Sequence, residues 1–216
     1  MPRLLQPELL DALPPEHPDA RHSRRDLRLI NLFMGNHRWL ARVVAGAVHD
    51  GERILELGAG DGVLACRLAG AGRTVDALDL APPPPGWPAG LAWHNANLLN
   101  FSGYGQYHAV IGNLIFHHFS DAELAALGRS FRDAVRVIIA CEPARRKFSQ
   151  QLFALVAPVF RANRVTLHDA HVSIDAGFDG DELPQLLGLD PARWNWRCRT
   201  TRHGACQMVA VRLPPP

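Results

Sequence analysis

Three glycines at alternate positions follow a short apolar segment, and an acidic residue comes just before them. Glu56, Gly58, Gly60 and Gly62 form this pattern, and a helix-like stretch follows at residues 63–69. Glycine permits the backbone angles of a tight turn and leaves no side chain between the backbone and a ligand. A strand that turns tightly into a helix also aims the N–H groups of the helix start at that ligand. The pattern therefore predicts a turn that binds a small molecule.

An aspartate at the end of the next apolar run extends this prediction. Asp79 lies near the end of the strand-like run at residues 74–80. An acid at the end of that strand can accept hydrogen bonds from both hydroxyls of a ribose, as nucleotide-binding α/β domains require. Asp76 is the alternative, but it lies in the middle of the run. We therefore expect Asp79 to contact the ligand.

Apolar runs of strand length alternate with helix-like stretches along most of the chain. We expect strands at residues 54–57, 74–80, 91–94, 108–119 (with the exit of that strand), 135–141, 194–202 and 205–213. This alternation predicts an α/β fold, with a mostly parallel seven-stranded sheet that ends in an antiparallel hairpin. Ligands of open α/β sheets bind at the carboxyl ends of the strands. The polar residues at or just after such ends are Asp79, Asn113, His117, His118 and Glu142.

Two classes of ligand share this geometry. Dinucleotide sites use the spacing G-x-G-x-x-G, and Val63 stands where that pattern needs its third glycine. The spacing of the acid and the three glycines instead resembles the first motif of class I S-adenosylmethionine-dependent methyltransferases. The run Asn-Leu-Ile-Phe-His-His-Phe-Ser-Asp-Ala-Glu-Leu, which begins at Asn113, resembles the fourth motif of small-molecule methyltransferases. The resemblance, to a bacterial subgroup that acts on small molecules, covers about residues 36 to 213.

This resemblance implies a Rossmann-like class I methyltransferase fold with extra N-terminal helices, and S-adenosylmethionine as the cofactor. Glu56 can then face the ammonium group of the cofactor's methionine portion. Asn97 takes the place where the family usually has an acid that binds the adenine amino group, and an amide oxygen can also accept that hydrogen bond. The residues expected to bind the cofactor are Glu56, Gly58, Ala59, Gly60, Gly62, Asp79, Leu80, Asn97, Leu98, Asn113 and Leu114.

The methyl acceptor is expected beside the ends of the fourth and fifth strands. A hydroxyl acceptor must lose its proton, and a neutral imidazole suits that task, so we expect His117, His118 or His168 to act as the base. Glu142 or Asp169 would orient the base. The hypothesis is therefore O-methylation of a small phenolic or aromatic acceptor, while carbon and nitrogen acceptors stay open. The residues expected to bind the acceptor are Glu142, Arg145, Asp169 and Ser173.

Two stretches near the end of the chain bear on the acceptor. Arg145 falls in the first turn of a helix expected over residues 144–162, where a positive charge opposes the helix dipole. It indicates either an anionic or phenolate partner or simply an exposed charge. Residues 165–178 are rich in His, Asp and Ser and predict an acceptor-binding insertion, with a metal site or a polar surface loop as alternatives. We expect no metal cofactor.

The first 49 residues precede the expected methyltransferase domain at residues 50–213. Residues 1–22 predict a loosely structured arm. Ser23 is expected to cap a first helix, and a second helix is expected over residues 37–48. These helices either cover the ligand or only cap the sheet, and both interpretations remain open.

Composition sets the remaining limits. The chain has 216 residues, a net charge of +2 and 47% hydrophobic residues, which is typical of a globular protein with one compact domain. The basic residues are not concentrated on one stretch and no base-stacking motif is present, so we expect no nucleic acid partner. The apolar runs are too short for a membrane span or a signal peptide, and the four cysteines lack metal-ligand spacing.

These limits favour a cytoplasmic protein whose partner is a small-molecule acceptor, and they leave a homodimer open. One alternative function is a non-catalytic S-adenosylmethionine-binding subunit of a biosynthetic complex. The other alternative is an NAD-dependent oxidoreductase.

Overall fold

The computed structural model describes residues 1–14, 16–159 and 161–214. Its centre is a seven-stranded sheet with the order β3-β2-β1-β4-β5-β7-β6. Five strands pair in parallel, whereas β7 runs antiparallel to both of its neighbours. The strands are β1 (Arg53–Leu57), β2 (Thr74–Asp79), β3 (Trp93–Asn95), β4 (Ala109–Asn113), β5 (Val137–Pro143), β6 (Trp194–Thr200) and β7 (Ala205–Arg212).

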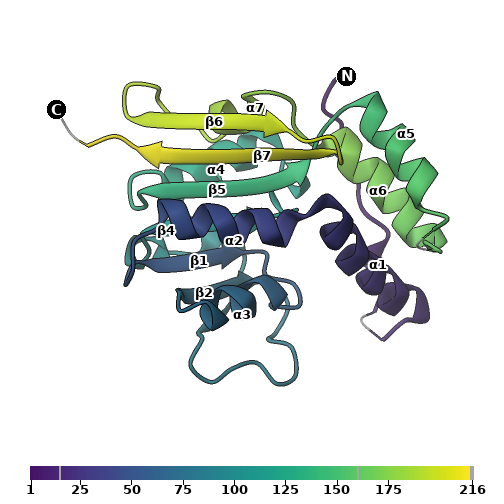
Figure 1. The fold of residues 1–216 in the computed structure, drawn as a ribbon, viewed down its shortest axis with the longest axis horizontal. Coiled ribbons are helices and arrows are strands. Elements are labelled where there is room, and N and C mark those ends of the chain that lie inside the picture. The colour runs from purple at the N-terminus through teal and green to yellow at the C-terminus, as the bar shows by residue number, and fades with distance from the viewer. Residues whose placement is uncertain (15, 160, 215–216) are drawn as a thin grey trace.

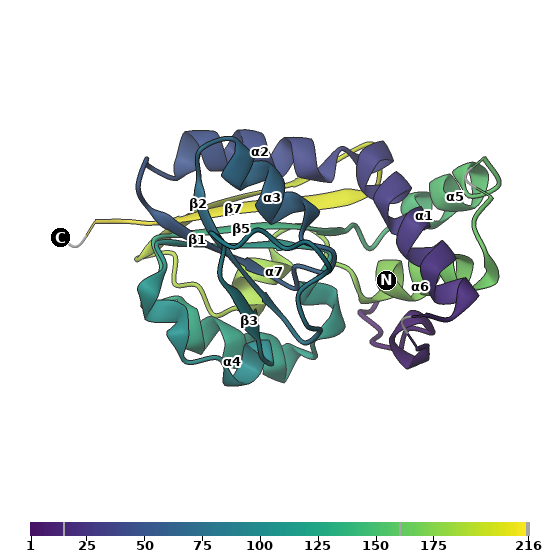
Figure 2. The ribbon, with the colours of Figure 1, turned by 90° about the horizontal axis from the view of Figure 1, so that it is seen from below.

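Helices cover both faces of the sheet (Figure 2). α2 (Asn36–Ala47) and α3 (Val63–Gly70) lie on one face, and α4 (Asp121–Phe131) and α7 (Glu182–Leu186) lie on the other. Each face has its own core, because alternate residues of a strand point to opposite sides of the sheet. Ile54 belongs to the core under α2 and α3, whereas its neighbour Leu55 belongs to the core under α4 and α7.

A second group of helices lies beyond the carboxyl ends of the parallel strands (Figure 1). It contains α1 (Pro18–Met34), α5 (Lys147–Val156) and α6 (Arg164–Ala176). α6 packs against both α1 and α5. The N-terminal segment, with the short 3₁₀-helix η1 (Leu10–Ala12), lies against the same end of the sheet. This helical cap therefore closes the edge at which ligands of open α/β sheets bind.

Most of the expected elements are confirmed, including the parallel strands, the C-terminal hairpin and the second N-terminal helix. The start of the first helix was predicted wrongly. His17, not Ser23, is the N-cap, and Pro18 occupies the first turn, where proline fits well. Ser23 instead lies buried within α1, and its hydroxyl accepts a hydrogen bond from Thr166 Oγ1 of α6.

Most of residues 165–178 forms α6, so the alternative of a polar surface loop was wrong, while the acceptor-binding insertion stays a prediction. Asn163 caps that helix by accepting a hydrogen bond from Thr166 N. The helix expected over residues 144–162 is shorter, since α5 ends at Val156; that prediction also included Phe160, which lies outside the described residues. The domain boundary near residue 50 stays a prediction, although α2 already packs on the sheet.

None of the helices within the three described ranges has the length and apolar character that crossing a bilayer requires.

Candidate functional site: a glycine turn and a cavity

The glycine turn after β1 has the conformation that its sequence predicts. Gly58, Gly60 and Gly62 have φ angles of 63°, 57° and 69°, which residues with side chains rarely adopt. A Cβ atom on Gly58 would lie 2.5 Å from the side chain of Ile115, whereas one on Gly60 would meet nothing within 4 Å. The backbone at Gly60 therefore faces open space and is accessible to a ligand.

Asp79 holds this turn in place from the end of β2. Its carboxylate accepts hydrogen bonds from Gly60 N and Ala81 N, both at 2.8 Å. The alternative residue, Asp76, is buried and pairs with Arg53 at 2.6 Å and with the hydroxyl of Tyr107 at 3.0 Å. Asp76 is thus part of the sheet's structure, and Asp79 is the aspartate that contacts the glycine turn.

Glu56 is a buried carboxylate beside the turn. Its Oε2 atom has no hydrogen-bond donor within the described parts of the chain. Burial, with the nearby carboxylates of Asp61 and Asp79 adding to it, raises the pKa of Glu56 to about 8, although a hydrogen bond from Ala65 N acts the other way. A buried acceptor without a donor costs stability, so this atom is suited to receive a donor from a ligand.

The junction of α1 and α2 reaches the neighbouring strand end. Asn31 Oδ1 accepts hydrogen bonds from the side-chain amides of Asn36 and Asn113, at 3.2 and 2.9 Å. The amide oxygens of Asn36 and Asn113 are buried and, among the described residues, have no donor. α2 therefore packs on the sheet, as one interpretation expected, and the α1–α2 junction contacts the end of β4. Whether these helices also cover a ligand stays a prediction.

The other residues expected to bind the cofactor differ in their exposure and in their contacts. Leu98 is buried in the core under α4, and Ala59 is also buried. The exposed Asn97 accepts a hydrogen bond from Leu99 N and so caps a short 3₁₀-helix, η2 (Leu98–Asn100). Leu80 has 70% of its surface exposed. Leu114 has a φ of 57°, a conformation that costs free energy in a leucine and marks the exit of β4 as strained.

The carboxylate of Glu142 binds the backbone at the exit of β4. It has 0% exposure, and its carboxylate accepts hydrogen bonds from Ile115 N at 2.9 Å, Phe116 N at 3.1 Å and His117 N at 3.3 Å. It also contacts His117 Nδ1 at 2.7 Å. A residue so enclosed cannot reach a small acceptor, so the expectation of direct acceptor binding by Glu142 is corrected to one of positioning the His117 ring.

The N-terminal arm, residues 1–14, is docked rather than loosely structured. Leu4 N donates to Asp175 O at 3.0 Å, and Leu9 N and Leu10 N donate to the Asp169 carboxylate at 2.7 and 2.9 Å. Arg3 adds hydrogen bonds to backbone carbonyls of the β4 exit and of α6. Asp169, expected to bind the acceptor or orient a base, therefore holds the arm.

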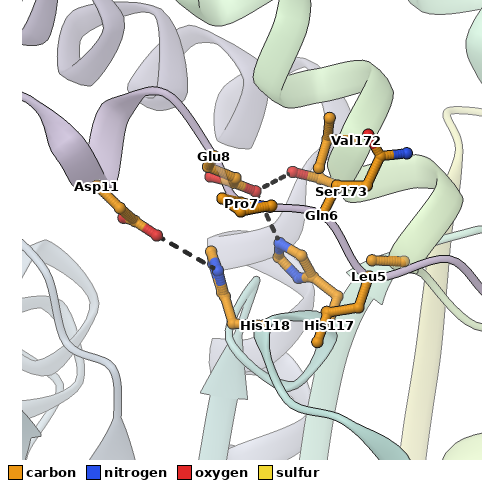
Figure 3. Close-up of a pocket in the computed structure, with 10 residues that line it drawn as sticks. Leu5, Gln6, Pro7, Glu8, Asp11, His117, His118, Val172 and Ser173 are labelled. Carbon is orange, nitrogen blue, oxygen red and sulfur yellow. Dashed lines mark hydrogen bonds and ion pairs between the residues drawn. The ribbon is translucent and has the colours of Figure 1, made fainter.

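The arm, the β4 exit and α6 enclose a cavity of about 410 Å³ (Figure 3). Two histidines of the short 3₁₀-helix η4 (Phe116–His118) line it, together with residues of the arm and of α6. Glu8 of the arm lies between His117 Nε2, at 3.4 Å, and the hydroxyl of Ser173. Asp11 lies 4.0 Å from His118 Nδ1. The cavity wall is therefore polar on the histidine side.

The ionisable groups in this wall shift one another's pKa values. Burial disfavours a charged His117, but its hydrogen bonds to Glu142 and Glu8 outweigh that effect and raise its pKa to about 9. Burial also works against the charged form of Glu8, yet the pairing with His117 lowers its pKa. Burial and the neighbouring His117 lower the pKa of His118. The two adjacent histidines thus differ in charge near neutral pH.

Only some of the residues expected at the acceptor line the cavity. His117, His118 and Ser173 line the cavity, whereas His168 and Arg145 are absent from its lining. His168, with 42% of its side chain exposed, contacts Asp169 at 2.9 Å through Nδ1. Arg145 is buried and donates to Gly177 O and Glu182, so it joins structural elements.

Glu8 and Asp11 were not predicted as site residues. Their only signal in the sequence is an acidic character within a proline-rich arm.

The fold is that of the class I methyltransferases, because the strand order, the single antiparallel strand β7 and the glycine turn after β1 occur together in it. Several solved structures share this fold with the chain. The plantazolicin methyltransferase BpumL, in complex with SAH (S-adenosylhomocysteine), has a TM-score of 0.73 and 10% identity, over 94% of this chain and 92% of its own.

Two further structures extend the comparison. The pyocyanin biosynthetic protein PhzM has a TM-score of 0.54 and 15% identity, over 80% of this chain and 54% of its own. A structure that describes the conversion of a disulfide bond into a thioacetal group in echinomycin biosynthesis has a TM-score of 0.58 and 20% identity, over 81% of this chain and 80% of its own. The sequence matches no model of a protein family and no curated protein.

Proposed function

We propose that this protein transfers a methyl group from S-adenosylmethionine to a small acceptor. The observation that carries the proposal is Glu56, a buried carboxylate with an unpaired oxygen beside a glycine turn. An ammonium group is the partner that such an oxygen lacks, and the cofactor's methionine portion carries one. The SAH complex of BpumL, which has the same fold, supports this assignment.

The residues at and around the glycine turn fit the parts of this cofactor. Backbone at Gly60 is open to a ligand, and Asp79 stands at the end of β2, where it can accept hydrogen bonds from ribose hydroxyls. When bound, S-adenosylmethionine supplies a methyl group on a sulfonium that is already activated for displacement. The chain then has to bind, orient and exclude water, which are contributions of proximity in a closed site.

We place the acceptor in the cavity under the arm. A hydroxyl acceptor must lose its proton, and His117 and His118 both line this cavity. His118, whose pKa is lowered, is the one able to accept a proton, whereas His117 is held charged by Glu142 and Glu8. Glu142 positions the His117 ring through Nδ1. O-methylation of a small phenolic or aromatic acceptor therefore stays our proposal, with the two adjacent histidines, rather than His168, at the acceptor.

A pair of histidine variants tests this placement. His118→Ala is expected to lower methyl transfer by about 10²-fold or more, the usual contribution of a group that assists proton removal. His168→Ala is the matched control and is expected to leave turnover unchanged. The measurement is transfer of radiolabelled methyl groups to a panel of phenols, with SAH affinity checked for both variants. Equal turnover of His118→Ala and the unchanged protein would remove the histidines from the mechanism.

Binding of SAH should release a proton through Glu56. With a pKa of about 8, most Glu56 side chains are protonated at pH 7, and an ammonium partner favours the charged form. Calorimetry at pH 7 in buffers of different ionisation enthalpy is expected to show nearly one proton released, and affinity should rise between pH 6 and pH 8. In Glu56→Gln no such release is expected. A buffer-independent enthalpy in the unchanged protein would contradict the role of Glu56.

The docked arm favours one alternative, a subunit that binds the cofactor without turnover. Residues 5–8 of the arm line the acceptor cavity, as an obstructed site would require. Tight SAH binding without methyl transfer to any acceptor would support this alternative.

An NAD-dependent oxidoreductase is not proposed further. Dinucleotide domains have the strand order 3-2-1-4-5-6, whereas here β7 is inserted between β5 and β6 and runs antiparallel to both. Titration with NAD⁺ beside SAH checks this difference directly.

A further inference from the structure

Three metal-binding side chains meet at the mouth of the cavity. Glu8 of the arm and both histidines of η4, His117 and His118, each offer one donor atom, and these atoms lie within 4.8 Å of one another. Figure 3 shows the two imidazole rings beside the arm, with the Glu8 carboxylate directed at His117. The sequence predicted no metal, because the only metal site considered, in residues 165–178, lacked helix spacing and a third, distant set of ligands.

The distances suit a first-row divalent cation. A tetrahedral site with bonds of about 2.0–2.1 Å needs ligand atoms about 3.4 Å apart. Glu8 Oε1 and His117 Nε2 are separated by 3.4 Å, so this pair already has the required spacing. The His118 ring lies 4.2 Å from the His117 ring, centroid to centroid, and is only 31% exposed in its side chain. With His118, the three ligand atoms all lie within 4.8 Å of one another.

The second ring nitrogen of His117 is already held as metal sites require. A ligating histidine usually donates its other N–H group to a carboxylate, which fixes the ring and its tautomer. His117 Nδ1 lies 2.7 Å from the fully buried Glu142, so Nε2 is the nitrogen that faces Glu8. Ser173 contacts the Glu8 carboxylate and fixes it in turn. Neighbouring groups therefore hold His117 and Glu8 in the orientations that they need as ligands.

The charge of the cluster also calls for a cation. Three carboxylates, from Glu8, Asp11 and Glu142, surround the two imidazoles. Asp11 is 68% exposed, whereas the Glu8 side chain is only 12% exposed and Glu142 is fully buried, so two largely buried carboxylates face the single positive charge of a protonated His117. A divalent cation restores the balance, since buried charges need partners of opposite sign.

We propose that Glu8, His117 and His118 bind one Zn²⁺-like divalent cation, with a fourth position open to the cavity. Two imidazoles and a carboxylate are typical ligands of catalytic zinc, which keeps one position for water or substrate. The cation ties the arm to the β4 exit. If the proposed methyl transfer is correct, the cation takes over the task of the imidazole base, because a ligating histidine has no lone pair left for a proton. A bound divalent cation can instead bind the acceptor hydroxyl and lower its pKa.

Titration of the full-length protein tests the site. Protein treated with EDTA and dialysed is titrated with ZnCl₂ by calorimetry and with CoCl₂ by visible absorption. We expect one equivalent to bind, with the intense d–d bands of a tetrahedral Co²⁺ site. We also expect Zn²⁺ to protect the arm from limited proteolysis, because Glu8 is a ligand. No binding of Zn²⁺ at about 100 μM would overturn the proposal.

Matched variants locate the binding. Glu8→Gln and His118→Ala are expected to weaken Zn²⁺ binding at least tenfold, whereas His168→Ala, outside the cluster, is expected to bind as the unchanged protein does. Glu8→Gln preserves shape and His118 is partly exposed, so both variants should fold, as circular dichroism can verify. Equal Zn²⁺ affinity in all three variants would place the metal elsewhere and overturn the site.

SAH affinity is measured on the same samples. Retained SAH binding without Zn²⁺ binding overturns the metal site alone, and Zn²⁺ binding without SAH affinity overturns only the proposed function.

Discussion

Replacing Asp79 with alanine is expected to weaken SAH binding by about 100-fold or more while leaving the protein folded. The carboxylate has two tasks in the proposed site. It accepts hydrogen bonds from Gly60 N and Ala81 N, and it stands where the ribose hydroxyls of the cofactor would bind. A hydrogen bond to a charged group contributes about 1.5–3 kcal/mol, so losing the hydrogen bonds from the two ribose hydroxyls accounts for the expected change in SAH affinity.

Asp76 provides the matched control for this prediction. Asp76→Asn removes a charge from a buried cluster with Arg53 and Tyr107, so it should lower the melting temperature. The partners of Asp76 are Arg53, Ala92 and Tyr107 rather than the glycine turn, so the SAH affinity of Asp76→Asn should stay close to that of the unchanged protein. Calorimetric titration of both variants, with thermal unfolding in parallel, separates the two roles. Weaker SAH binding in Asp76→Asn than in Asp79→Ala would reverse our assignment of the two aspartates.

The strand–turn–helix around Glu56 could be predicted because its signal is local. Three glycines within five residues allow few conformations other than a tight turn, and the apolar runs on either side give the strand and the helix. The end of β2 follows from the same pattern, which places Asp79 beside the glycine turn. The structure therefore agrees with the sequence on the backbone of the glycine turn.

The arm could not be predicted, because its position depends on contacts between distant parts of the chain. Leu9 N and Leu10 N are held by Asp169, and nothing near Glu8 in the sequence indicates that it reaches His117. Asp169 itself was misjudged for the same reason. Its acidic character was visible, but the sequence does not show that its partners are backbone N–H groups of the arm.

The three candidate histidines show the same limit. His117 and His118 follow a strand end, and the general rule for α/β sheets placed them correctly beside a cavity. His168 was grouped with them because residues 165–178 were expected to form an insertion. Most of the stretch forms α6, and His168 lies outside the cavity lining while Ser173, five positions later, lines it. The helical register, which sequence reasoning lacked, decides between them.

The largest loss of stability among single substitutions at the site is expected for Glu142→Ala. Its carboxylate accepts hydrogen bonds from three successive backbone N–H groups and contacts His117 Nδ1 in a fully buried position. Alanine would leave these donors buried without an acceptor, which costs about 3–5 kcal/mol. For a chain of this size the melting temperature should then fall by about 10 °C. Scanning calorimetry measures the change.

Glu123→Ala is the matched control, because Glu123 also accepts a backbone hydrogen bond but does so at the capping box of α4, where its loss costs about 1 kcal/mol. Glu142→Gln should fall between the two, since an amide retains one oxygen but turns its NH₂ group towards a donor. If Glu142→Ala melts no lower than Glu123→Ala, the carboxylate does not hold the β4 exit. In that case the backbone conformation at Leu114 and the packing of Phe116, rather than Glu142, would hold both cavity histidines in position.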